Sequence, residues 1–229
     1  MKLNSHFDAQ LKELKQSLED MTARDLECLK TIYEALESGN LEPLSQIRGM
    51  SMEIDRAERV IESLCLKILL RRQPVAGDLR HVSSTLKMIT DLQRIGHQSC
   101  DFAEITLKGG KDLAGHFRVL ADMAELVIAM FESAISACVH EDAFSARCVI
   151  LSDGDVDIAY VLLRTRLSEK IRAGDSPVSD TLLDVLMLGK YLERMADHVV
   201  LFARWIVFSA TGERPEEESG RLASSSDET

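Results

Sequence analysis

Apolar residues recur every three or four positions along almost the whole chain. This is the period of an amphipathic α-helix, in which such residues lie on one face. Helix-breaking residues are few, and they fall at Gly39 with Asn40, Pro43, Pro74 with Gly77, Gly109 with Gly110, Gly174 to Pro177, and Gly212. We therefore predict six long helices, near residues 5–38, 44–71, 76–108, 112–140, 143–173 and 178–210. Because the connections are short, consecutive helices should be antiparallel neighbours.

The composition supports helices over sheets. Aromatic residues, which are enriched in strands, make up only 5% of the chain, and the 12 glycines and 4 prolines leave long stretches without a breaker. The 229 residues are 45% hydrophobic, which is enough to bury a substantial core. We expect an all-α protein.

An internal repeat divides the chain. Residues 91–98 (DLQRIGHQ) align with residues 191–198 (YLERMADH), and residues 54–58 align with residues 156–160 at a slightly larger offset. We predict one three-helix unit over residues 1–108 and a second over residues 111–212. The polar, acidic stretch 213–229 has no apolar period, so we expect it to be disordered.

Net charge and hydropathy exclude two classes of partner. The formal net charge of −11 argues against nucleic acid, because phosphate recognition requires clustered Lys and Arg. The most apolar stretch, residues 199–208, is interrupted by Arg204 and falls short of the roughly 20 residues that cross a bilayer. We expect no insertion into a membrane.

The cysteines favour a reducing compartment. They are odd in number, widely spaced and not preceded by a secretory signal, which predicts reduced thiols in a cytoplasmic protein. Each lies in an apolar helical stretch, so we expect core packing for all five: Cys28, Cys65, Cys100, Cys138 and Cys148.

Two acidic pairs stand out in the second half. Asp153 and Asp157 are four residues apart on one predicted helix, and Glu193 and Asp197 are four apart on the next. In an antiparallel hairpin centred near residue 175, Asp157 faces Glu193 and Asp153 faces Asp197. Four carboxylates at this spacing repel one another unless a cation or protons compensate, which predicts a metal site.

Oxygen-only ligands suit Fe, Mn, Mg or Zn ions, and the ligand types do not choose among them. The alternative is that these acids lie on a solvated face and pair with nearby cations, for which the candidates are Arg164, Arg166, Lys190 and Arg194. Spacing alone leaves both interpretations open.

The matching positions in the first half are Ser51, Asp55, Gln93 and His97. Only Asp55 is acidic, so the charge that would hold a hard cation is mostly lost, and we predict a degenerate site. His97 and Asp101 are also four residues apart and offer a different, imidazole-containing site, although a single His on a helix is more often structural.

A cluster of basic residues lies at the end of the first predicted hairpin, in the run RRQPVAGDLRH: Arg71, Arg72, Arg80 and His81. Capping of a helix C-terminus by Arg71 and Arg72 is favoured there over anion binding.

Several stretches carry a family resemblance: FDAQLKEL near the start, EIDRAERVIE, RRQPVAGDLRHVSSTLKMITDLQRIGHQSCDFAEI and KYLERMADHVV. With these stretches the chain resembles the PhoU family of phosphate-signalling proteins, up to about residue 210. The densest motif is RQPVAGDLR followed by DLQRIG.

The resemblance implies two tandem antiparallel three-helix bundles related by pseudo-twofold symmetry. It also implies metal binding through acidic motifs, which Asp153, Asp157, Glu193 and Asp197 match in the second repeat. The first repeat departs from the pattern at three positions, namely Ser51, Gln93 and His97. An asymmetric protein is therefore expected.

The function implied by the resemblance is restraint of the phosphate-starvation response. Such a protein contacts the ATPase subunit of a phosphate ABC transporter and the sensor histidine kinase of the phosphate two-component system, and it turns over no substrate. One alternative is a metal-free helical scaffold. Another is a di-metal carboxylate oxidoreductase, but the Glu-x-x-His motif of such enzymes does not occur in the chain. Homodimer formation and direct phosphate binding are left open by the sequence.

Overall fold

The structure, a computed structural model, describes residues 2–71, 76–172 and 180–213. Every regular element in these ranges is helical. The elements are α1 (Lys2–Ser38), the 3₁₀ helix η1 (Glu42–Gln46), α2 (Ile47–Arg71), α3 (Ala76–Gly109), the 3₁₀ helix η2 (Gly110–His116), α4 (Phe117–His140), α5 (Ala143–Arg172) and α6 (Asp180–Thr211). The chain is all-α, as the periodicity predicts.

Each of the six predicted helices is present, and the largest differences are at three starts: the first helix begins earlier than predicted, at Lys2, and two others begin later. The second helix begins at Ile47 and the fourth at Phe117, because a 3₁₀ segment precedes each. At the second of these, Gly110 takes a φ of +53°, which ends α3 in a conformation that suits glycine. The predicted turns at Pro74 and at Gly174 to Pro177 lie outside the described residues, as does the expected disorder of residues 214–229.

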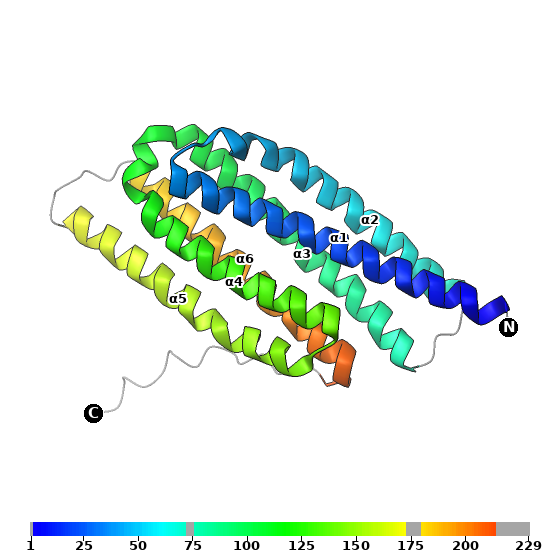
Figure 1. The fold of residues 1–229 in the computed structure, drawn as a ribbon. Coiled ribbons are helices and arrows are strands. Elements are labelled where there is room, and N and C mark those ends of the chain that lie inside the picture. The colour runs from blue at the N-terminus through cyan, green and yellow to red at the C-terminus, as the bar shows by residue number, and fades with distance from the viewer. Residues whose placement is uncertain (1, 72–75, 173–179, 214–229) are drawn as a thin grey trace, which may run out of the picture.

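The helices form two antiparallel three-helix bundles that lie side by side (Figure 1). Helices α1, α2 and α3 make the first bundle, and α4, α5 and α6 make the second. The most extensive helix pair is α3 with α6, the third helix of each bundle, so these two form the seam between the halves. This is the tandem, pseudo-twofold arrangement that the repeat and the resemblance imply.

The core is continuous across both bundles because each helix buries its apolar face. Leu18 and Met21 of α1 are buried, and so are Leu120 and Met123, which occupy the matching turns of α4. The two bundles therefore bury the same pattern of side chains at equivalent places. No helix in the described ranges is long and apolar enough to span a membrane.

The expectation that all five thiols pack in the core is wrong for one of them. Cys28 and Cys65 are buried, Cys100 and Cys138 are partly buried, and Cys148 is exposed. Cys148 lies on the side of α5 that faces away from α4 and α6, because Ala146 and Val149 take the buried positions of that turn. An apolar sequence neighbourhood did not decide which way this side chain points.

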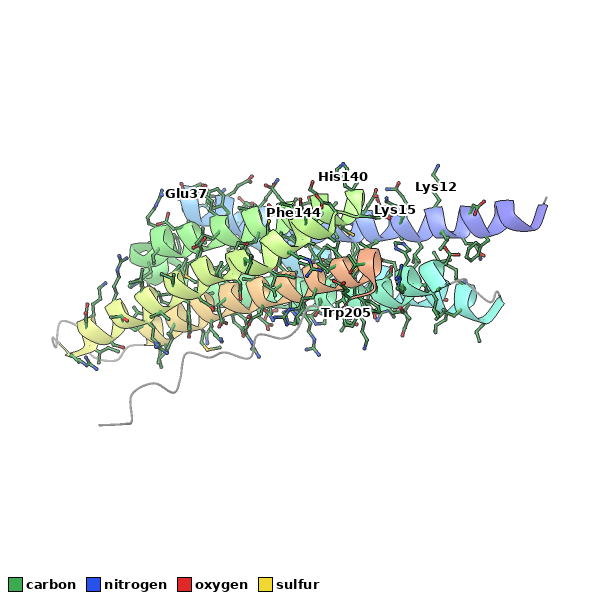
Figure 2. All side chains as sticks on the ribbon, turned by 90° about the horizontal axis from the view of Figure 1, so that it is seen from below. Lys12, Lys15, Glu37, His140, Phe144 and Trp205 are labelled. Carbon is green, nitrogen blue, oxygen red and sulfur yellow. The ribbon has the colours of Figure 1, made fainter. Side chains whose placement is uncertain are left out.

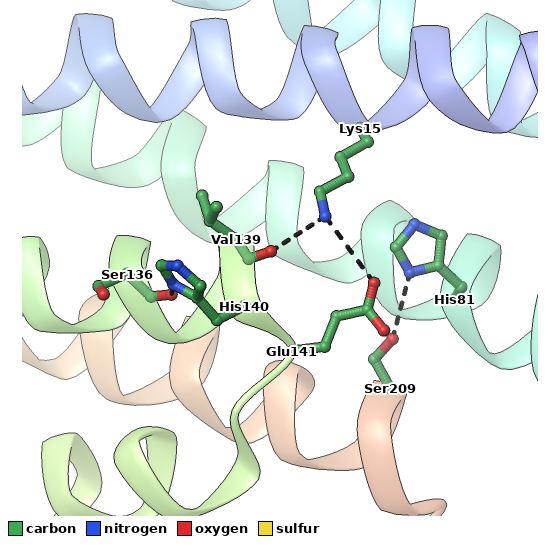
Figure 3. A network of polar contacts seen from close by, with 7 residues as sticks. All are labelled: Lys15, His81, Ser136, Val139, His140, Glu141 and Ser209. Carbon is green, nitrogen blue, oxygen red and sulfur yellow. Dashed lines mark hydrogen bonds and ion pairs between the residues drawn. The ribbon is translucent and has the colours of Figure 1, made fainter.

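Polar contacts join the two bundles at one end (Figure 3). Lys15 of α1 donates to the backbone oxygen of Val139 over 3.0 Å and lies 3.9 Å from the Glu141 carboxylate, next to the end of α4 (Figure 2). His81 of α3 lies 3.4 Å from the Ser209 hydroxyl of α6. A cation thus meets the backbone oxygens that end α4, where it is favoured by the helix dipole.

Candidate carboxylate site

The four acidic residues of the second half lie on the facing sides of α5 and α6. Asp153 and Glu193 are partly buried, while Asp157 and Asp197 are on the exposed side. The helices approach closely one turn before Glu193, where Gly189 has so little room that a Cβ atom would lie 2.5 Å from Leu163. The small residue allows the α5–α6 contact beside the site.

The carboxylates are close enough to disfavour one another's charge. Burial, and after it the charges of Asp157, Asp197 and Glu193, raise the pKa of Asp153 to about 6. Burial and the charge of Glu193 likewise raise the pKa of Asp197. The tertiary structure therefore brings the predicted quartet into one electrostatic group.

Two cations flank this group. Lys190 forms an ion pair with Glu193 and lies 5.4 Å from the centre of the Tyr160 ring. The charge of Arg204 acts on Asp153 and offsets a small part of the rise in its pKa. Of the four cations that the solvated-face interpretation named, Lys190 pairs with Glu193, although the Glu193 side chain is mostly buried. Arg204 was missed, although its position two turns after Asp197 on the same helix is visible in the sequence.

Donor chemistry and geometry give different answers about a metal ion. Carboxylate oxygens under mutual repulsion suit a hard cation, which would relieve the raised pKa values of Asp153 and Asp197. Yet in the ranges that the structure covers, no three His, Cys, Asp or Glu side chains converge as ligands of one ion. The second-repeat quartet fits a cation in charge and in ligand type, without forming a ready coordination shell.

The first-repeat positions do not fit a metal ion. One oxygen of Asp55 receives the amide of Gln93 at 2.9 Å and the Nε2 atom of His97 at 2.8 Å. Burial opposes ionisation of Asp55, but these two hydrogen bonds, together with the charges of His97 and Arg59, outweigh it, and its pKa lies below the ordinary value. Ser51 is buried on α2 and supplies no charge. Hydrogen-bond donors of the protein take the place that a cation would need.

Asp101 is not part of this group. Its side chain is exposed, and its charge adds to the effect of burial that raises the pKa of Tyr191 on α6. His97 meets Asp55 instead, across α2 and α3. The imidazole-containing alternative therefore loses its second proposed member.

The contact made by His198 was not predicted from residue spacing. Its Nδ1 atom lies 3.1 Å from Asp91 of α3, so the pair crosses the seam between the bundles. In the aligned repeats Asp91 matches Tyr191 and His198 matches Gln98. The sequence signal for this contact is that Asp91 and His198 each replace an uncharged residue at the equivalent position of the other repeat.

Comparison with known proteins agrees with the fold and with the repeat. A family model described as "PhoU domain" matches residues 18–106 and again residues 120–206. A Synechocystis protein named "Phosphate-specific transport system accessory protein PhoU homolog" is 31% identical over 92% of this chain and 93% of its own. A Thermotoga maritima homolog 1 of the same name is 28% identical over 93% of this chain and 92% of its own.

Two crystal structures share the architecture. PhoU from Pseudomonas aeruginosa superposes with a TM-score of 0.83 at 25% identity, over 90% of this chain and 100% of that one. The phosphate transport system regulatory protein PhoU from Streptococcus pneumoniae superposes with a TM-score of 0.84 at 25% identity, over 92% and 99% of the two chains. Sequence and structure comparisons therefore agree over nearly the whole molecule.

Proposed function

The chain belongs to the PhoU family, and on that premise we propose that it regulates phosphate transport and represses the phosphate-starvation response by contact with other proteins. Its partners are the ATPase subunit of a phosphate ABC transporter and the sensor histidine kinase of the phosphate two-component system. It acts in the cytoplasm and turns over no substrate.

The observation that carries this proposal is the pair of family matches, which together take in residues 18–106 and 120–206. The relatives that cover nearly all of the chain are named as accessory proteins of a phosphate-specific transport system. Long helices without a membrane-spanning stretch in the described ranges suit a protein that docks on partners.

Deletion of the gene tests the regulatory role. With phosphate plentiful, loss of the protein should switch on a phosphate-starvation reporter, and a copy of the intact gene should switch it off again. A reporter that stays repressed in the deletion strain would contradict the proposal.

Capture of partners tests the contacts separately. The tagged full chain, recovered from phosphate-replete cells, should carry the transporter ATPase subunit or the histidine kinase, as identified by mass spectrometry. If neither protein is recovered from cells that make both of them, the assignment of partners is wrong. The regulatory role is then still tested by the gene deletion.

We further propose that the second repeat holds a metal ion at Asp153, Asp157, Glu193 and Asp197. A bound cation would supply charge compensation there. The residues of this chain would hold it with carboxylate oxygens, and Lys190 would give up its pairing with Glu193. Support comes from the burial of Asp153 beside three other carboxylates, which together raise its pKa.

Elemental analysis of protein purified without chelator tests the site. The paired substitution Glu193→Ala with Asp197→Ala should remove the bound metal, whereas the matched pair Gln93→Ala with His97→Ala in the first repeat should leave the metal content unchanged. Equal metal in the wild type and the second-repeat variant would exclude the site. Loss in both variants would place it elsewhere.

A further inference from the structure

Asp25 is a carboxylic acid in the middle of the first bundle. It lies on α1 and is fully buried, and neither of its side-chain oxygens has a hydrogen-bond partner among the described residues. Buried polar atoms in folded proteins nearly always have a partner. This residue therefore differs from the other acids in the described ranges, which reach solvent or a basic side chain.

The space that accommodates Asp25 comes from a glycine on α3. A Cβ atom at Gly96 would lie 3.2 Å from one carboxylate oxygen of Asp25 and 2.9 Å from the side chain of Ile54 on α2. The three helices of the bundle thus enclose the carboxyl group in an apolar place with no room to spare. A fully buried charge without a partner is strongly disfavoured in such surroundings.

The second repeat shows what this place holds without the acid. The family matches begin at residues 18 and 120 and end at residues 106 and 206, so Asp25 corresponds to Val127 and Gly96 to Ala196. Both second-repeat residues are fully buried. The second bundle has Val127 and Ala196 where the first bundle has Asp25 and Gly96. The fold itself therefore does not require a carboxyl group at this place.

The titratable groups around Asp25 offer it no positive charge. On its own helix Cys28 has its pKa raised by burial and by the charge of Asp25, and on α3 Cys100 has its pKa raised by burial and by Glu104. Two nearby basic residues are engaged elsewhere, since Arg24, next to Asp25 on α1, pairs with Glu53 of α2, and His97, next to Gly96 on α3, pairs with Asp55.

On the other side of α1, Lys30 pairs with Glu132 of α4 over 2.7 Å. Consistent with these surroundings, burial raises the pKa of Asp25 well above its ordinary value.

We propose that Asp25 makes the docking of α1 against α2 and α3 depend on a proton. The first bundle is closed while the acid is neutral, and α1 loosens when the proton leaves, because the carboxylate must then reach water. The second bundle, with Val127 at the matching place, has no such dependence. The proton dependence is therefore confined to the first bundle.

The sign of the effect follows from the two states. The folded chain holds the Asp25 proton more tightly than the unfolded chain, whose Asp ionises near pH 3.9. Opening therefore releases a proton, and the opening equilibrium rises with pH by at most about tenfold per pH unit until the folded-state pKa is reached. Above that pKa the dependence ends.

Amide hydrogen exchange by mass spectrometry between pH 5 and 8 tests the proposal. In the wild type, protection of residues 18–32 should fall with rising pH by up to about tenfold per unit relative to Asp25→Asn, which cannot ionise. Residues 120–134 of the same molecule are the internal control and should keep the same protection in both proteins. The exposed Asp20→Asn should behave like the wild type.

Asp25→Val, which copies the second repeat, provides a second route if the Asn variant folds poorly. It should remove the pH dependence and raise protection of residues 18–32. Equal pH profiles for residues 18–32 in the wild type and in either Asp25 variant would overturn the proposal. So would a wild type in which residues 18–32 and 120–134 respond to pH in the same way.

Discussion

The pKa values of Asp55 and Asp153 shift in opposite directions, although each residue lies on the second helix of its repeat. Two hydrogen-bond donors lower the pKa of Asp55, whereas burial and three neighbouring carboxylates raise that of Asp153. Sequence spacing predicted that Asp55 lies opposite Gln93 in the first hairpin, where the two are hydrogen-bonded. The direction of each pKa shift depends on burial and on side-chain contacts, which only the packed helices supply.

The raised pKa of Asp153 predicts a pH-dependent loss of stability in protein from which metal has been removed by a chelator. Its folded-state pKa of about 6 exceeds the unfolded value, so the folded chain binds this proton more tightly and stability is lost as pH rises from about 4 to 6. Asp153→Asn should therefore unfold less readily than the wild type at pH 7, by roughly 1 kcal/mol after allowance for solvent screening.

Urea denaturation with a chelator at pH 4.5 and pH 7 measures the difference, with Asp155→Asn as the control on the same helix. A difference of equal size at both pH values would contradict the assignment. Added Mn²⁺ should reduce the advantage of the variant, because a bound cation compensates the carboxylates of the wild type.

At the level of elements, Asp142 caps the N-terminus of α5, the helix that carries Asp153 and Asp157. One oxygen of Asp142 accepts the backbone N–H groups of Phe144 at 2.9 Å and Ser145 at 3.2 Å, and the other accepts the Ser145 hydroxyl at 2.6 Å. Asp is a preferred residue for this position. The preceding Glu141, with a φ of 54°, ends α4 and turns the chain.

Asp142→Ala should make the amides of the first turn of α5 exchange several-fold faster than in the wild type, while α4 is unaffected. Hydrogen bonds from Ser145 lower the pKa of Asp142, so the cap stabilises the helix above the ordinary pKa and is lost as pH falls through the lowered value. The wild type and the variant should converge in strong acid. Unchanged exchange near neutral pH would show that the cap does not hold this turn.

Across the whole molecule, the seam between α3 and α6 makes one body of two repeats. Asp91 and His198 meet there with little solvent access, their side chains being 12% and 21% exposed. Ser99 of α3 lies against Met195 of α6 nearby. The seam is therefore apolar with a few specific polar links, which fix how the two bundles are aligned.

Asp91→Ala should lower the unfolding free energy of the whole protein by about 1–2 kcal/mol, because His198 loses its partner at a partly buried place. Fluorescence of Trp205, the single tryptophan, would follow urea unfolding from within α6. Asp101→Ala, which removes an exposed acid from the same helix, serves as the control and should change little. Equal stability of the Asp91 variant and the wild type would contradict a structural role for the link.

The sequence by itself determined the helical class, the six helices and the duplication, because a 3.6-residue apolar period and a few breakers are local properties of the chain. The tertiary structure alone decided that Asp55 is satisfied by Gln93 and His97, that Cys148 is exposed, and that Asp25 is enclosed without a partner. These outcomes depend on the rotation of each helix about its axis and on contacts between distant segments, neither of which residue spacing specifies.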